Sequence, residues 1–152
     1  MAICAWISIP LFHLSYTLQT LAVFLTLFTL GGKRGTLTIG IYLLLGGVGL
    51  PVFSGFRGGL GALLGVTGGF LWGFLLTGLV YWALERICKP LGIVLGMALC
   101  YLAGSIWYSV YMGNIGIAAA LLQCVAPYLI PDILKIILAQ YLSNRLRRQI
   151  TV

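Results

Sequence analysis

Charged side chains are scarce in this sequence: they make up only 7% of its 152 residues, whereas soluble domains average about a quarter. There are two acids, Glu85 and Asp132, and one histidine. A soluble core of this size needs a polar shell, so a water-soluble fold is excluded. The hydrophobic fraction of 61% instead predicts a chain that lies in lipid and has no soluble domain.

Motifs that would indicate chemistry are also missing. The four cysteines lack the short spacings of a metal or redox site, and His13 has no second ligand at metal-binding spacing. No phosphate-binding loop is present, so the chain is not expected to hydrolyse nucleotide itself. No second carboxylate accompanies Asp132, and no Ser/His/Asp or Cys/His arrangement is evident. We therefore expect no catalytic residues, no metal and no cofactor.

Six apolar runs, each a candidate membrane pass, fill the chain. Short breaks rich in glycine and proline separate them, which predicts one transmembrane domain over residues 1–152. The expected fold class is an all-α membrane protein with a six-helix bundle. The first run spans only about 18 Å as a helix, so this pass is expected to be truncated or its start codon misplaced. The runs cover residues 1–12, 17–31, 36–50, 61–84, 91–112 and 116–144.

Basic residues set the direction of the bundle. Most of them lie in breaks between passes or after the last pass. An even number of passes separates these positions, so they are all on the same side of the cell membrane. The positive-inside rule places that side, and with it both termini, in the cytoplasm. The net charge of +7 therefore mostly reflects the topology of the chain in the membrane. It suits an anionic inner leaflet and gives no reason to expect nucleic-acid binding. These basic residues are Lys33, Arg34, Arg86, Lys89, Arg145, Arg147 and Arg148.

The other two basic residues, Arg57 and Lys135, break this pattern. Counted back from Arg145, Lys135 lies about 15 Å along a helix, near mid-membrane, where an unpaired ammonium is costly. Asp132, three residues earlier, shares a helix face with it. Two prolines in PYLIPDILK predict a broken helix at this depth, as in polar substrate sites. The pair is therefore a candidate ligand site, with a structural ion pair as the alternative.

A glycine-rich stretch, LPVFSGFRGGLGALLGVTGGFL, covers residues 50–71. Residues 51–59 are expected to form an external lid, since irregular backbone at membrane depth is tolerated only beside a cavity. Gly61, Gly65 and Gly69 recur every fourth residue and are expected to form a helix-packing surface. Arg57, within the lid, is either a ligand contact or a solvated loop residue.

Two further polar or aromatic positions leave alternatives open. Gln19 either faces the cavity or makes a hydrogen bond between helices. Tyr108, with Trp107 and Tyr111, either stacks on a flat ligand or belongs to the interfacial aromatic belt.

Several stretches resemble the BioY family, the biotin-specific S components of energy-coupling factor (ECF) transporters. YLLLGGVGLPVFSGFRGGLGALLGVTGGFL, Tyr42 to Leu71, is similar to the family's signature. ISIP, TLQTLAVFL, GGKRG and PDILKIILAQYLSNRLRRQ resemble other family stretches in the same order. The resemblance implies a six-helix bundle that captures biotin from outside, closes its loops over it, and docks on a transmembrane coupling subunit with two ATPase subunits. Transport in the family is thought to involve toppling of the S component.

The resemblance also implies a ligand site. Asp132 and Lys135 of PDILK correspond to the acid and lysine of a BioY-like site, and a carboxylate suits the ureido N–H donors of biotin. Arg57, in the FRGG stretch of the covering loop, is expected to hold the valerate carboxylate. The other expected ligand-binding residues are Phe53, Gly58, Gly59, Gln19, Phe70 and Tyr108.

The chain also departs from the family pattern. Val66 stands where proline is usual and Phe70 where tyrosine is usual, so ligand selectivity is open. Ala2 and Ala5 lack the Ala-xxx-Ala spacing expected of the docking surface on the first helix. The alternatives are an S component for another vitamin, a non-catalytic membrane scaffold, and a small intramembrane enzyme, for which a second catalytic group is missing.

Overall fold

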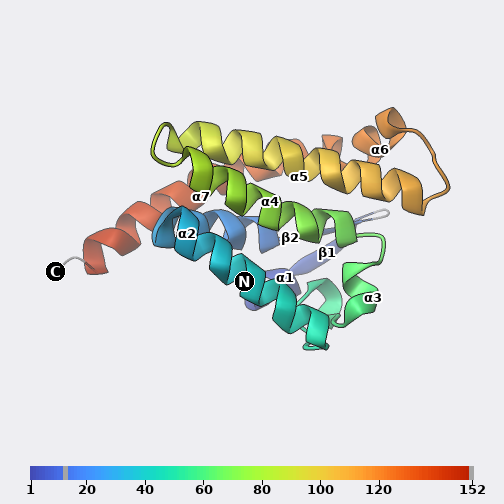
Figure 1. Ribbon diagram of the computed structural model, residues 1–152, viewed down its shortest axis with the longest axis horizontal. Helices are drawn as coiled ribbons and strands as arrows, with labels where there is room; N and C mark the ends of the chain where they lie inside the picture. The colour runs from blue at the N-terminus through green and yellow to red at the C-terminus, as the bar shows by residue number, and fades with distance from the viewer. Residues whose placement is uncertain (12–13, 151–152) are drawn as a thin grey trace.

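The computed structural model describes residues 1–11 and 14–150 as a bundle of helices lying along one long axis (Figure 1). Helix α4 packs on α5 and on α2, and α2 also packs on α7. The buried core between them includes Leu27, Ile39, Tyr81 and Ile93. The elements in chain order are α1 (Ala2–Trp6), β1 (Ser8–Leu11), β2 (Leu14–Thr17), α2 (Gln19–Val48), the 3₁₀ turn η1 (Ser54–Phe56), α3 (Leu60–Leu63), α4 (Gly68–Leu84), α5 (Lys89–Tyr111), α6 (Ile117–Cys124) and α7 (Ala126–Ile150).

Helix α2 consists of two helices joined at Gly31. This residue has φ +80°, a value that glycine adopts without strain, and the chain reverses direction there (Figure 1). Gly35, after the turn, lies against Leu27, before it. The predicted break at GGKRG between the second and third passes is therefore confirmed.

From residue 17 onward the described helices follow the expected runs, except that the run over residues 61–84 is divided into α3 and α4. The expected helix over residues 1–12 is wrong in its extent. Of residues 1–11, which the structure describes, only those of α1 are helical, and β1 pairs with β2 as an antiparallel hairpin, with Ser8 opposite Thr17. Pro10 lacks a backbone N–H, and the β-branched residues Ile7 and Ile9 precede it, which disfavours a helix and suits an edge strand.

The described helices differ in whether they are long and apolar enough to span a membrane. By length and composition, α5 is able to cross a membrane alone, and α6 with α7 does so as a pair bent by 50°. Helix α4 is a shorter apolar helix. The bend at Val125 confirms the predicted break in the last pass, and Pro127 lies in the first turn of α7, where proline is tolerated. The break does not extend to Pro131, which lies inside α7.

Glycines allow α4 and α5 to approach closely. A Cβ added at Gly73 would lie 2.9 Å from Cα of Cys100, and one at Gly96 would lie 3.0 Å from Cα of Thr77. Small residues at such positions let helix backbones pack by dispersion and shape.

The expected packing surface of Gly61, Gly65 and Gly69 is wrong except at Gly69, which packs against Trp107 of α5. Gly61 belongs to α3, where an added Cβ would meet nothing within 4 Å. Gly65 lies in the turn that follows and contacts the carbonyl of Gly61. The repeat fails because α3 and α4 are separate helices, so these positions do not share a face.

The acid Glu85 stabilises the turn within α2. It follows the end of α4, and its Oε2 accepts a hydrogen bond from the backbone N–H of Gly32 at 2.6 Å. This N–H begins the second half of α2, where a carboxylate satisfies an unpaired donor and interacts favourably with the helix dipole.

We expect Glu85→Ala to destabilise the protein by about 1 kcal/mol, the usual cost of losing an N-terminal helix cap. Glu85→Gln should be intermediate, because its amide oxygen still accepts the hydrogen bond without the charge. Thermal unfolding in detergent, followed by circular dichroism, measures the effect. Arg86→Ala is the matched control, since Arg86 is exposed beside Glu85. Unfolding of Glu85→Ala at the wild-type temperature would contradict the assignment.

Candidate ligand-binding site

A cavity of about 750 Å³ lies between α2, the α2–α3 loop, α4, α5 and α7. This volume is within the range of about 300–1,000 Å³ that small-molecule sites occupy. Its buried apolar wall includes Val23, Phe24, Phe74 and Met97. Such a wall suits the apolar body of a ligand, so its specificity depends on the few polar groups that line it.

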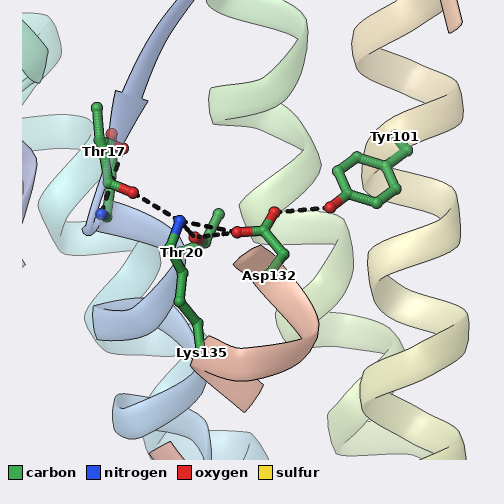
Figure 2. Close-up of polar contacts among 6 residues, drawn as sticks. Thr17, Thr20, Tyr101, Asp132 and Lys135 are labelled. Carbon is green, nitrogen blue, oxygen red and sulfur yellow. Dashed lines mark hydrogen bonds and ion pairs between the residues drawn. The ribbon is translucent and has the colours of Figure 1, made fainter. Parts of the chain in front are cut away.

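The main polar group of the cavity is the pair Asp132 and Lys135. Both side chains line it and are almost fully buried, at 2% and 5% exposure. Lys135 Nζ lies 2.8 Å from Asp132 Oδ1, one helical turn away (Figure 2). Two opposite charges this close compensate each other, which makes their burial tolerable.

All three protons of the Lys135 ammonium have acceptors. Nζ donates to Asp132 Oδ1, to the backbone carbonyl of Thr17 at 2.7 Å and to Thr20 Oγ1 at 2.9 Å (Figure 2). The ammonium also lies 4.2 Å from the centroid of the Tyr16 ring, a cation–π contact. A ligand that bonded Lys135 directly would have to displace one of these acceptors.

The Asp132 carboxylate, in contrast, keeps accepting capacity. Oδ1 accepts from Lys135 and, at 3.0 Å, from Thr20 Oγ1, while Oδ2 accepts from the Tyr101 hydroxyl at 2.6 Å. A carboxylate offers about four acceptor positions, so in the described part of the chain Oδ2 retains one. Tyr101 also lines the cavity, and its oxygen is a second acceptor for a ligand N–H.

The hairpin is attached to this polar cluster. Thr17, the last residue of β2, accepts the Lys135 hydrogen bond through its carbonyl. Its neighbour Tyr16 stacks on Tyr128 of α7 with the ring centroids 6.1 Å apart. The end of the hairpin is therefore held directly over the ion pair.

The α2–α3 loop forms another wall of the cavity and is held by several contacts. The Tyr42 hydroxyl donates to the carbonyl of Val52 at 2.8 Å, and Trp6 Nε1 donates to the carbonyl of Pro51 at 2.7 Å. Phe53 packs its ring directly against Gly46, where any larger residue would collide with it. The loop is thus an ordered wall whose cavity-lining residues include Phe53, Arg57 and Gly58.

The cavity brings together most of the predicted ligand-binding residues, from four separate segments: Gln19, Phe53, Arg57, Gly58, Phe70, Asp132 and Lys135. Gln19 satisfies both of its interpretations, because it lines the cavity and its Nε2 donates to the Tyr42 hydroxyl at 3.0 Å. The Arg57 side chain is exposed at the cavity.

The described cavity wall does not include Gly59 or Tyr108. Gly59 precedes α3 with φ +87°, and its N–H donates to the carbonyl of Gly46 at 2.6 Å. Tyr108 is buried against α6, and its hydroxyl contacts Gln123 Oε1 at 3.4 Å. His13 lies outside the described residues, and within these no three His, Cys, Asp or Glu side chains are grouped to hold a metal.

Sequence reasoning missed three residues of the polar cluster: Thr17, Thr20 and Tyr101. Thr20 follows the predicted Gln19 directly, but nothing in its spacing relates it to Asp132. Tyr101 is a polar position in the middle of the apolar helix α5, which was a usable signal. Its partner Asp132 lies on α7, so only the tertiary structure identifies the contact.

The helical fold and this cavity together define a small ligand-binding protein of the membrane. The model of the BioY family matches residues 1–152, so the chain belongs to the BioY family.

Relatives of known name agree with this assignment. The chain is 37% identical over 149 residues to the biotin transporter BioY of Thermotoga maritima, covering 95% of this chain and 87% of that protein. It is 34% identical over 143 residues to the probable biotin transporter BioY of Pyrococcus horikoshii, covering 94% and 86%.

A solved structure is similar in fold. The crystal structure of the S-component for biotin from an ECF-type ABC transporter superposes with a TM-score of 0.84 at 27% sequence identity. The match covers 97% of this chain and 84% of that one. The arrangement of helices described above is therefore that of an S component.

Proposed function

We propose that this protein binds biotin in the membrane and serves its uptake as the S component of an ECF-type ABC transporter. The observation that carries the proposal is the buried Asp132–Lys135 pair, which lines a ligand-sized cavity in a chain of the BioY family. The proposed activity is binding and transport, without catalysis.

In the proposed complex the ureido ring of biotin lies at the buried end of the cavity. One ureido N–H donates to the remaining acceptor position on Asp132 Oδ2, and the Tyr101 oxygen is available to the other. Lys135 orients the carboxylate through its hydrogen bond to Oδ1. The bicycle contacts apolar residues such as Phe24 and Phe74, which supply burial without competing polar groups.

The valerate carboxylate is assigned to Arg57. This side chain comes from the α2–α3 loop, lines the cavity and is exposed, so a charged ligand end can remain hydrated beside it. A guanidinium binds a carboxylate through two parallel hydrogen bonds when the geometry permits.

Orientation in the membrane follows from charge. The turn within α2, the α4–α5 connection and the C-terminal end of α7 lie at one end of the bundle, and they carry exposed basic residues (Figure 1). We assign this end, which carries the C-terminal end of α7, to the cytoplasm and the loop carrying Arg57 to the outside. Helix α1 contacts that loop through the hydrogen bond of Trp6 to Pro51, so the expected cytoplasmic N-terminus does not fit this arrangement. The proposed partners are a transmembrane coupling subunit and two ATPases, which energise transport.

Biotin titration of the purified protein in nanodiscs tests the function. Saturable binding of one biotin is expected, and mass spectrometry should find biotin co-purified with the protein. Thiamine and riboflavin serve as control ligands. Saturation by one of them in place of biotin would favour an S component for another vitamin, and no saturable binding at all would favour a scaffold.

Arg57→Gln is expected to weaken biotin binding about tenfold, because a charge-assisted contact to the carboxylate is lost. Biotin methyl ester, which has no carboxylate charge, should bind the variant and the wild type with similar affinity. Isothermal titration with both ligands measures the difference. Arg86→Gln, an exposed arginine at the other end of the bundle, is the control. An equal loss for acid and ester would place the carboxylate elsewhere.

A further inference from the structure

The cavity is larger than biotin requires. At the loose packing of liquid water, about 30 Å³ for each non-hydrogen atom, biotin would occupy roughly 480 Å³. The cavity holds about 750 Å³, so roughly 270 Å³ stays unfilled even by this generous measure. A site built only for the free vitamin would leave this space to water.

The two ends of the cavity differ in character. Asp132, Lys135 and Cys124 on its inner side are buried. Arg57, Thr67 and Tyr111, which also line it, are exposed. All three lie in or beside connections between helices, namely the α2–α3 loop, the α3–α4 turn and the end of α5. Because these residues are exposed and also line the cavity, we infer that the cavity opens between these connections.

The opening is lined by small residues as well. Gly55 and Gly61 line the cavity and are exposed, and a Cβ added at Gly61 would meet nothing within 4 Å. The free volume therefore lies beside residues that leave room for a substituent, and the exposed guanidinium of Arg57 is close to the same opening.

We propose that this site also accepts biotin whose carboxyl group carries a short polar amide, with ε-N-biotinyl-lysine as the representative ligand. The inference rests on the proposed function, because it places the ureido ring at Asp132 and the valerate chain toward the opening. An amide at the end of that chain leaves every ureido contact intact. The lysine part occupies the free volume and the opening, and its own carboxylate replaces that of biotin at Arg57.

Competition against radiolabelled biotin on the protein in nanodiscs tests this inference. Biotinyl-lysine is expected to displace biotin with an apparent Kd within about tenfold of that of biotin, the range set by one charge-assisted contact. A biotin derivative methylated on the ureido nitrogens should fail to compete, since it cannot donate to Asp132. A larger loss for biotinyl-lysine, with biotin itself binding tightly, would overturn this inference alone. Absence of biotin binding would overturn the proposed function.

A substitution at the opening separates the two ligands. Gly61→Phe should weaken biotinyl-lysine at least about fivefold more than biotin, because the ring would occupy the space of the amide substituent. Gly40→Phe is the matched control: Gly40 is outside the described cavity wall, and its nearest neighbour is Cδ1 of Leu75 at 4.0 Å. Retained biotin binding shows that a variant is folded. If Gly61→Phe no longer binds biotin, Thr67→Trp, at the same opening, is used in its place. Equal effects on both ligands would overturn the inference.

Discussion

Replacement of Asp132 by alanine is expected to remove at least 90% of the affinity for biotin. A charge-assisted hydrogen bond to a buried ligand contributes about 1.5–3 kcal/mol, which corresponds to roughly tenfold or more in Kd. The same change leaves the Lys135 ammonium buried at 5% exposure without its carboxylate. Loss of one partner from a buried ion pair destabilises a protein by about 3–5 kcal/mol, so the melting temperature should fall as well.

A set of variants distinguishes a ligand site from a structural ion pair. Asp132→Asn keeps the shape and one acceptor oxygen but loses the charge. Lys135→Ala leaves an unpaired carboxylate, and the double variant Asp132→Ala with Lys135→Ala removes both charges. The double variant should regain much of the lost stability, because no charge stays unpaired, yet it should not regain biotin binding.

The measurements are biotin titration and thermal unfolding of each variant in the same detergent. Wild-type affinity in the double variant would show that the pair has a structural role only. Unchanged affinity in both single variants would remove the pair from the ligand site. Tyr101→Phe extends the series: it deletes the hydroxyl that donates to Asp132 Oδ2 at 2.6 Å and should give a smaller loss of affinity.

Gly73→Leu is expected to prevent folding of the bundle. The Cβ of any larger residue at this position would lie 2.6 Å from Sγ of Cys100 and 2.9 Å from its Cα, and the second of these atoms is backbone. Overpacking a core usually costs about 1–3 kcal/mol when side chains can move, and here the helix itself must move. The contact between α4 and α5 also positions Tyr101 toward the site.

Yield of monodisperse protein and the helical signal in circular dichroism measure this effect. Gly40→Leu is the matched control, because its surroundings are open to 4.0 Å. Cys100→Ala should not rescue Gly73→Leu, since Cα of residue 100 remains in place. Normal yield and stability of Gly73→Leu would mean that α4 and α5 are further apart than described.

Several features of the fold could be predicted from the order of residues. Long apolar runs predicted the helices from residue 17 onward apart from the division between α3 and α4, and GGKRG predicted the reversal at Gly31. Pro127 of PYLIPDILK predicted the bend at the start of α7, and the spacing of Asp132 and Lys135 predicted their contact. Each of these is a local property, since it depends on the backbone preferences and spacing of residues within a few turns of one another.

The first seventeen residues and the glycine repeat could not be predicted in this way. An apolar stretch of this length is compatible with a helix or a strand. The hairpin makes its contacts far along the chain, with the Thr17 carbonyl bonded to Lys135 and Tyr16 stacked on Tyr128. The fourfold repeat of glycines presupposed one continuous helix, whereas α3 ends at Leu63 and α4 begins at Gly68.

The membrane environment, the helical class and the pairing of an acid with a lysine in the last helix all follow from composition and short spacings in this chain. The surroundings of that pair do not. Thr20, Tyr101 and the Thr17 carbonyl reach it from α2, α5 and β2, and Arg57 reaches the cavity from a loop. Hydrogen bonds between segments far apart in sequence depend on how the helices pack, and packing is a property of the whole set of side chains at once.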